Sequence, residues 1–300
     1  MSSTIHYILG KGGVGKTRIS VMLAKHLAKQ NKNVLLVEVQ GCTDIPLYWN
    51  IPSKGYAITS LERNISAFSI TPTEAIEEYA LQQLRIKGLF ELIFRNRLVS
   101  ALVNSAPGLH DAVQLGKIYD LATQAQYRNF TDIIVDCPST GHGIALLTAA
   151  KTMMNVSRSG TLYEKNKLVD TVMHKQAKIW LVTIPTELPC LELFALHKHI
   201  QETWHPHSHP IQGIFVNQYQ PFDTTLFETT TLHNLAPIQQ THPLEYQQLQ
   251  RLQTQWQHEH RNQEHWWQEL QTLGLAMYAQ PWTSSLEFEA KLTAMLQEQL

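Results

Sequence analysis

Gly10-Lys11-Gly12-Gly13-Val14-Gly15-Lys16-Thr17 is the stretch of this chain that decides its fold class. It fits the pattern G-x-x-x-x-G-K-[S/T], in which glycines free successive backbone N–H groups to point at phosphate oxygens. In such a loop the lysine at the position of Lys16 neutralises the terminal phosphates, and the hydroxyl of Thr17 binds Mg²⁺. The stretch therefore predicts a phosphate-binding loop, or P-loop.

The segments on either side of the loop have the pattern that a P-loop requires. Residues 4–9 are apolar enough for a buried strand, and residues 18–30 have the spacing of a helix whose N-terminus faces the phosphates. Residues 33–39 then form a second apolar strand. A strand, loop, helix and strand in this order predict a parallel pair joined by a right-handed crossover.

Composition narrows the class of protein. With 300 residues and 43% hydrophobic content the chain can bury a full core. Its net charge of −1 lacks the positive excess that is typical of nucleic-acid-binding proteins. The 3 cysteines are far apart, which favours a reducing compartment over a disulfide framework. No apolar run reaches the roughly 18 residues of a membrane span. We expect a cytoplasmic protein without an integral membrane segment.

Further apolar runs predict the rest of a mostly parallel, doubly wound α/β sheet. They lie at residues 64–70, 131–136, 177–184, 211–217 and 275–280. Residues 72–127 instead have helical spacing, with an apolar stripe from Leu89 to Leu102 and no strand. We therefore expect a helical subdomain inserted before the strand at 131–136, within a single domain spanning residues 1–300. The stripe either packs inside the subdomain or dimer, or forms a groove for a client helix.

Two segments in the second half of the chain, one rich in glutamine and one rich in histidine, could have a binding role, but both also fit an ordinary structural one. Residues 243–273 are rich in glutamine and predict one long amphipathic helix, with Trp256 and Trp267 on its apolar side and Trp266 off that stripe. Histidines cluster between His197 and His209. They could bind a metal adventitiously, but no carboxylate or cysteine completes a site, so a polar loop between a helix and a strand is favoured.

Two charged residues extend the predicted phosphate site. Asp136 ends an apolar strand, where P-loop enzymes place a carboxylate that holds the Mg²⁺ shell. The alternative is an aspartate that only caps the following turn. Lys11 could reach a nucleotide held by a second subunit, although residue type alone favours a solvated loop lysine.

Several stretches in order resemble one family over nearly the whole chain. Residues 11–17 are similar to the deviant P-loop of the dimeric MinD/ParA-like ATPases, and residues 136–142 are similar to the D-T-A-P-T-G-H segment of one branch of them. That branch holds the arsenite-pump ATPase and the tail-anchored-protein-targeting ATPase. Its short bacterial members are the most similar. Further matches are Pro107-Gly108, Val216-Asn217-Gln218 and Pro281.

The resemblance implies a homodimeric ATPase with ATP and Mg²⁺ as cofactors, whose helical subdomain binds a client protein and moves with the nucleotide state. Contact with a membrane would then be peripheral, through a partner. Residues 136–142 would be the switch II segment, and Lys11 would cross to the partner's phosphates. The implied catalytic set is Lys11, Lys16, Asp136 and Gln40, with Thr17 and Asp136 at the metal. The implied nucleotide-binding set is Gly12, Gly13, Val14, Gly15, Lys16, Thr17, Arg18, Asn217 and Pro281, the last two on the adenine side.

One departure from the family pattern bears on catalysis. Gln40 stands where the family has the aspartate that orients the attacking water. A glutamine can orient water but accepts no proton, so hydrolysis should be slow unless Asp44 substitutes. The C-x-x-C zinc motif of the targeting ATPase and clustered cysteines for arsenite are both absent from the sequence. The alternatives are a nucleotide-bound regulator or scaffold that scarcely hydrolyses, and a ligase-type enzyme that phosphorylates a carboxylate.

Overall fold

A single sheet organises the molecule in its computed structural model, which describes residues 3–84, 108–204, 209–220 and 236–280. Within these ranges the sheet has eight strands in the order β3-β4-β2-β5-β1-β6-β7-β8, with only β3 and β4 antiparallel. The strands are β1 (Thr4–Gly10), β2 (Val34–Glu38), β3 (Thr59–Glu62), β4 (Ile65–Ser69), β5 (Asp132–Asp136), β6 (Ala177–Thr183), β7 (Ile211–Asn217) and β8 (Met277–Gln280). The predicted mostly parallel α/β sheet is confirmed.

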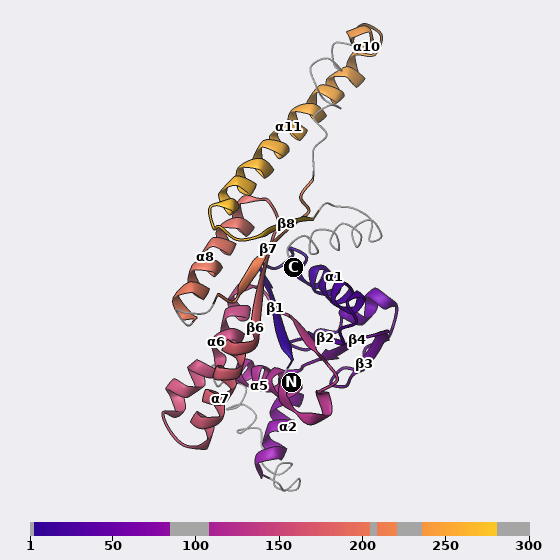
Figure 1. Cartoon of the computed structure of the whole chain (residues 1–300). Coiled ribbons are helices and arrows are strands. Elements are labelled where there is room, and N and C mark those ends of the chain that lie inside the picture. Colours follow the sequence, from indigo (N-terminus) through magenta and orange to yellow (C-terminus); the bar gives the residue numbers. More distant parts are fainter. Residues whose placement is uncertain (1–2, 85–107, 205–208, 221–235, 281–300) are drawn as a thin grey trace, which may run out of the picture.

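Helices cover both faces of the sheet (Figure 1). One buried cluster joins Ile8 of β1, and Val34 and Leu36 of β2, to the helix α1 (Lys16–Lys29). The other cluster joins the opposite residues of the same strands to helices α5–α8. These are α5 (Leu109–Thr123), α6 (Thr140–Ser157), α7 (Thr161–Gln176) and α8 (Glu187–Thr203). Burial on both faces explains why β2 is apolar along nearly all its length.

The inserted helices are present where the structure describes them. Helix α2 (Pro72–Leu84) packs on α5, and both precede β5, as predicted. The stripe from Leu89 to Leu102 lies outside the described residues, as does Pro107. The limits of the helical subdomain therefore stay a prediction.

Strand β3 is an element that the sequence did not reveal. It has four residues, alternates buried with exposed positions, and pairs antiparallel with β4 at the sheet edge. Residues 63–64 connect the two strands, with Asn64 in the left-handed conformation at φ 66°. Such a short, half-exposed strand carries too few apolar residues to give a strong pattern.

A long helix projects from the body beside α8 (Figure 1). This is α11 (Pro243–Gln271), which follows the short α10 (Ala236–Thr241) and covers most of the glutamine-rich segment. The expectation was wrong for Trp266, which is 9% exposed and belongs to the core, whereas Trp267 is partly buried and packs against that core, as expected, and Trp256 is partly buried. Trp266 and Leu270 lie one turn apart and join the main core, so the contact with the body sets which face is buried. None of the described helices is both long and apolar enough to cross a bilayer.

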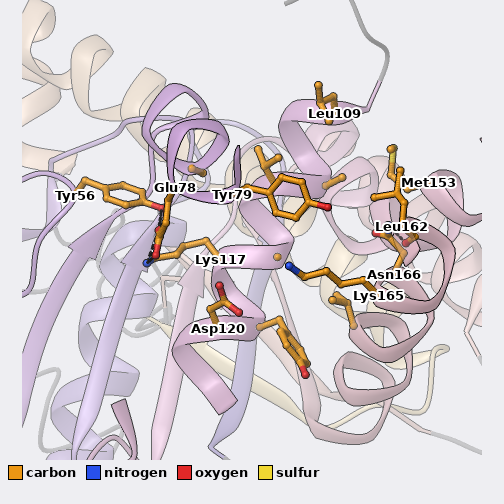
Figure 2. Close-up of a pocket in the computed structure, with 16 residues that line it drawn as sticks. Tyr56, Glu78, Tyr79, Leu109, Lys117, Asp120, Met153, Leu162, Lys165 and Asn166 are labelled. Carbon is orange, nitrogen blue, oxygen red and sulfur yellow. Dashed lines mark hydrogen bonds and ion pairs between the residues drawn. The ribbon is translucent and has the colours of Figure 1, made fainter. Parts of the chain in front are cut away.

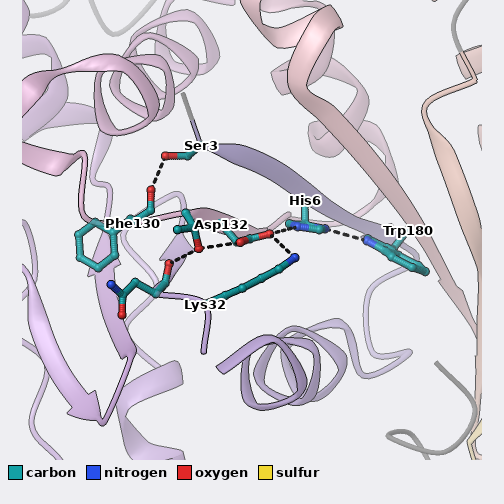
Figure 3. A network of polar contacts seen from close by, with 8 residues as sticks. Ser3, His6, Lys32, Phe130, Asp132 and Trp180 are labelled. Carbon is teal, nitrogen blue, oxygen red and sulfur yellow. Dashed lines mark hydrogen bonds and ion pairs between the residues drawn. The ribbon is translucent and has the colours of Figure 1, made fainter. Parts of the chain in front are cut away.

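A buried polar network crosses three strands at the edge of the sheet opposite the P-loop (Figure 3). His6 Nε2 lies 3.0 Å from Asp132 Oδ1, and the Trp180 indole donates to His6 Nδ1 at 3.2 Å. Because an indole N–H can only donate, Nδ1 carries no proton and Nε2–H donates to Asp132. Burial lowers the pKa of His6 against the opposing effect of Asp132. The native state therefore holds this histidine neutral.

We predict a pH dependence of stability from this histidine. Below its ordinary pKa of 6.5, the unfolded chain takes up a proton that the native His6 does not, so stability falls as pH falls. The variant His6→Gln removes this titration. Below pH 6.5 the wild type should lose up to about 1.4 kcal/mol per pH unit more than the variant. Urea unfolding of both proteins between pH 7.5 and 5 measures this difference. The pKa values of His26 and His197 are also lowered by burial, but both residues are present in both proteins. Equal slopes would contradict the prediction.

Candidate functional site

The predicted P-loop connects the end of β1 to the start of α1. Gly13 and Gly15 have φ angles of 84° and 91°, in the left-handed region that favours glycine. Helix α1 begins at Lys16, so its first N–H groups face the loop, as an anion site requires. The Lys16 ammonium donates to the Lys11 carbonyl at 3.0 Å and bridges the loop. The backbone therefore has the form of a phosphate cradle.

Three strands bring the acidic side of the site to the same edge. In the parallel register, Ile8 of β1 and Glu38 of β2 both lie opposite Asp136 of β5. Thr17 Oγ1 donates to Asp136 Oδ2 at 2.6 Å, and Ser20 Oγ donates to Asp136 Oδ1 at 3.2 Å. The two predicted Mg²⁺ ligands are thus in direct contact, although the sequence separates them by more than a hundred residues.

The donor set fits Mg²⁺, which prefers hard oxygen ligands such as a hydroxyl and a carboxylate. Burial raises the pKa of Asp136, while the Thr17 hydrogen bond and the Lys16 charge oppose that shift. Burial also lowers the pKa of Lys16. Each charge is therefore costly in the low-dielectric site, and a divalent cation beside a polyphosphate would compensate both.

Asn217, at the end of β7, lies beneath the P-loop. Its side chain is 3% exposed, and Nδ2 donates to the Val14 carbonyl at 2.8 Å. Its Oδ1 is buried and has no hydrogen-bond partner in the described structure. A Cβ on Gly15 would overlap the Asn217 amide. Asn217 thus supports the loop from below, while Pro281, its predicted partner on the adenine side, lies outside the described residues.

Lys11 is held within its own chain. Its ammonium pairs with Glu192 Oε1 of α8, and Thr140 at the start of α6 donates to Glu192 Oε2 at 3.2 Å. The Lys11 and Glu192 side chains are 28% and 33% exposed. One glutamate therefore links the P-loop to the start of the predicted switch II helix.

Gln40 lies in a tightly held loop after β2. It has φ 59° and is followed by Gly41 at φ 76°, so two consecutive residues are left-handed. For a residue with a Cβ this costs about 1–2 kcal/mol. The Gln40 N–H donates to Gln114 Oε1 at 2.6 Å, and the Gly41 N–H donates to the Ile70 carbonyl at 3.0 Å. The Gln40 side chain is exposed at the sheet edge that carries Asp136.

Glu38 is a buried carboxylate beside this loop. It is 2% exposed, and its Oε1 accepts from the backbone N–H groups of Asp44 and Ile45 at 2.6 and 2.9 Å. Burial raises its pKa to about 7 despite these hydrogen bonds, with Asp136 and Asp44 adding to the rise. Asp44, the candidate substitute for the missing aspartate, therefore begins the 3-10 turn η1 (Ile45–Trp49) that Glu38 caps.

Glu192, Gln114 and Glu38 were not identified from the sequence. Glu192 and Gln114 lie in ordinary helical patterns, and their partners are 181 and 74 positions away along the chain. The sequence does mark Glu38 as unusual, because it is a carboxylate in an otherwise apolar strand. Such a residue is rarely fully buried without a partner.

The histidine cluster does not form a metal site among the residues that the structure describes, where no group of three or more candidate ligands occurs. His197 and His199 lie on α8 rather than in a loop, so that part of the expectation was wrong. His205 and His207 lie outside the described residues.

Comparison with known proteins agrees with this geometry. The sequence model of the anion-transporting ATPase family matches residues 4–230. The chain belongs to this family. ATPase BagA of Mycobacterium tuberculosis is 29% identical over 228 residues, which are 72% of this chain and 65% of that protein. An arsenical pump-driving ATPase of Acidiphilium multivorum is 34% identical over 47% of this chain and 24% of its own length. The ATPase get3 of Neurospora crassa is 26% identical over 52% and 47%.

The coverage of these relatives is incomplete in both directions. The family match ends at residue 230, so α10, α11 and β8 follow it. The chain also spans less than two-thirds of the length of these relatives. Membership of the anion-transporting ATPase family is therefore shown, and it is consistent with the recognition of the arsenite-pump and targeting branch.

A small hollow lies away from the P-loop, among α2, α5, α6 and α7 (Figure 2). It has a volume of about 70 Å³. At one end, Lys117 donates to both oxygens of Glu78 at 2.9 and 2.7 Å, and Tyr56 donates to Glu78 at 2.5 Å. At the other end, the Lys165 ammonium lies 4.5 Å from the centre of the Tyr79 ring. The apolar lining comprises Ala75, Leu109, Ala112, Val113, Met153, Leu162 and Val169.

We predict that two P-loop glycines differ in their tolerance of alanine. Both have positive φ, so each substitution adds backbone strain of about 1–2 kcal/mol. A Cβ on Gly13 meets no atom within 4 Å, whereas one on Gly15 displaces the Asn217 amide from Val14. Gly15→Ala should therefore cost about 1–3 kcal/mol more than Gly13→Ala in urea unfolding without nucleotide.

The double variant Gly15→Ala/Asn217→Ala tests the cause of that difference. Removing the Asn217 amide gives the new Cβ room, so the two substitutions should be less destabilising together than the sum of their separate effects. Additive effects, or equal costs at Gly13 and Gly15, would show that Asn217 does not limit this position.

Proposed function

We propose that this protein is a cytoplasmic, Mg²⁺- and ATP-binding ATPase that acts as a nucleotide-gated homodimeric switch and binds a client protein through its helical subdomain. The observation that carries the proposal is the contact between Thr17 and Asp136 at the mouth of a glycine cradle. Membership of the anion-transporting ATPase family supports the same chemistry.

Each residue of the cradle has a distinct task in this proposal. Lys16 and the amides of residues 12–18 bind the phosphates, because they offer fixed N–H groups and one partly buried positive charge. Thr17 and Asp136 hold Mg²⁺, which when bound neutralises the charge that develops during phosphoryl transfer. Asn217 Oδ1 is the buried acceptor left for an adenine amino group, since Nδ2 is already engaged.

The dimer in this proposal depends on Lys11. To reach phosphates held by a second copy, the Lys11 ammonium must leave Glu192. Glu192 also accepts from Thr140, so release of Lys11 changes the charge beside the first turn of α6. Nucleotide state and the position of the helices on that side of the sheet would thereby be coupled.

Client binding is assigned to the helical side of the molecule. The hollow among α2, α5, α6 and α7 has mainly apolar walls, which suits an apolar segment of a partner. Arsenite is not proposed as cargo, because Cys42 and Cys137 follow β2 and β5, Cys190 lies on α8, and two of the three are buried.

The alternative function is a nucleotide-bound regulator that hydrolyses ATP slowly, and Gln40 is the residue that favours it. A glutamine at the position of the water-orienting aspartate accepts no proton, which favours a slow nucleotide-bound regulator. Phosphate release by the purified protein distinguishes an ATPase from such a regulator. In Gln40→Asp, a gain in turnover of roughly tenfold or more would favour the regulator for the natural chain, since about 1.4 kcal/mol of barrier is tenfold in rate.

The nucleotide site is tested first with Lys16→Ala. Loss of the partly buried ammonium removes the charge that faces the phosphates and the link to the Lys11 carbonyl, so ATP binding should fall at least about 100-fold. Isothermal titration with ATP and Mg²⁺ measures the affinity. Lys198→Ala is the matched control, because it removes an exposed lysine of α8 with 77% exposure and should bind ATP as the wild type does. Unchanged binding by Lys16→Ala would contradict the proposed site.

The trans role is tested with Lys11→Ala. This variant should bind ATP as a monomer with near-normal affinity but fail to dimerise and lose turnover, because the lysine acts on the partner's nucleotide. Light scattering with a non-hydrolysable ATP analogue measures the mass, and phosphate release measures turnover. Normal turnover would show that Lys11 does not act in trans.

A further inference from the structure

Gln114 of α5 makes a contact that neither the family comparison nor the P-loop explains. It is 1% exposed, and apart from Lys117 the other buried residues of α5 are apolar. Its amide joins two segments, because Oε1 accepts from the Gln40 N–H at 2.6 Å and Nε2 donates to the His110 carbonyl at 3.1 Å. A backbone N–H only donates and a carbonyl only accepts, so the two partners together fix the orientation of the amide.

The contact stabilises a conformation that the chain would otherwise disfavour. Gln40 has φ 59°, which few residues with a Cβ adopt unless the surroundings impose it. The hydrogen bond from its N–H to Gln114 is such a constraint, and the adjacent bond from Gly41 to Ile70 is a second one. Ile70 lies two residues before the start of α2, and Gln114 lies in the second turn of α5, so the loop is anchored near the N-terminal ends of both inserted helices described by the structure.

The hydrogen bonds of Gln40 and Gly41 hold the loop at the same sheet edge as the predicted phosphate site. Residue 40 follows β2 at the edge where β5 ends in Asp136. A side chain that orients water must be held in one place to be effective. We propose that Gln114 is a positioning residue for ATP hydrolysis, whose amide oxygen holds residue 40 in the left-handed conformation beside the phosphate site. The inference rests on the proposed ATPase function.

Two substitutions separate the hydrogen bond from the bulk of the side chain. Gln114→Met keeps the length of the chain and removes the acceptor, whereas Gln114→Glu keeps an acceptor for the Gln40 N–H in either protonation state and, when protonated, also donates to the His110 carbonyl. At pH 6.5, kcat for phosphate release should fall about fivefold to tenfold in Gln114→Met, the effect of one lost hydrogen bond, and should be largely restored in Gln114→Glu. The dissociation constant of a fluorescent ATP analogue should be unchanged in both variants.

The matched control is Gln124→Met at the C-terminal end of the same helix. Its half-buried side chain hydrogen-bonds Asp120 and accepts from the exposed Gln126, so the same chemical change occurs without contact to the loop. This variant should keep the wild-type kcat. An equal loss of kcat in Gln124→Met and Gln114→Met would overturn the proposal, because the effect would then come from general loosening of α5.

Hydrogen exchange provides a readout that does not require turnover. In nucleotide-free protein, the Gln40 amide should be protected in the wild type, Gln114→Glu and Gln124→Met, and should exchange at least about fivefold faster in Gln114→Met. Unchanged protection in Gln114→Met would overturn the contact, and faster exchange with a normal kcat would overturn the positioning role. A wild type without phosphate release would refute the proposed ATPase function and the catalytic role of Gln114 with it, while the exchange rates still decide whether Gln114 holds the loop.

Discussion

The parallel register of β1, β2 and β5 is the constraint on which the site depends. It places Ile8, Glu38 and Asp136 side by side, so that the loop after β1 opens directly beside two carboxylates. The hydrogen bond from Thr17 to Asp136 then fixes the first turn of α1 against the end of β5. Because parallel strands share one carboxyl edge, residues distant in sequence converge there without any special loop. A slip of one residue in the pairing of β1 with β5 would turn Asp136 away from Thr17.

One physical cause explains the charges around this edge. Burial raises the pKa values of Glu38 and Asp136 and lowers that of Lys16, so it disfavours the ionised form of both acids and base. The charges of these groups shift one another's pKa values, but they do not offset the free-energy cost of burying each charge. A triphosphate with Mg²⁺ brings negative charge to Lys16 and positive charge to the acids at once. The polar edge is therefore better suited to a charged ligand than to stability of the free protein.

Sequence reasoning succeeded where a residue's role follows from its immediate neighbours. The apolar runs gave the strands with two buried faces, and the glycine spacing gave the loop whose Gly13 and Gly15 have positive φ. It failed for β3, whose four residues alternate weakly, and for Trp266, whose burial depends on where α11 meets the body. The sequence pattern could not predict the contacts of Lys11 with Glu192 and of Gln40 with Gln114. Each joins a loop to a helix whose placement only the assembled sheet defines.

The contact between Lys11 and Glu192 raises the question of whether it could block the proposed dimer. Both side chains are about one-third exposed or less, and an ion pair of this kind contributes roughly 0–1 kcal/mol. Such a pair changes an association constant by less than about tenfold. Phosphates of a second nucleotide offer Lys11 a stronger, multiply charged partner. The pair therefore holds the lysine against its own chain but would not prevent its transfer in the proposed dimer, whose free energy of association would come mainly from the nucleotide and the interface.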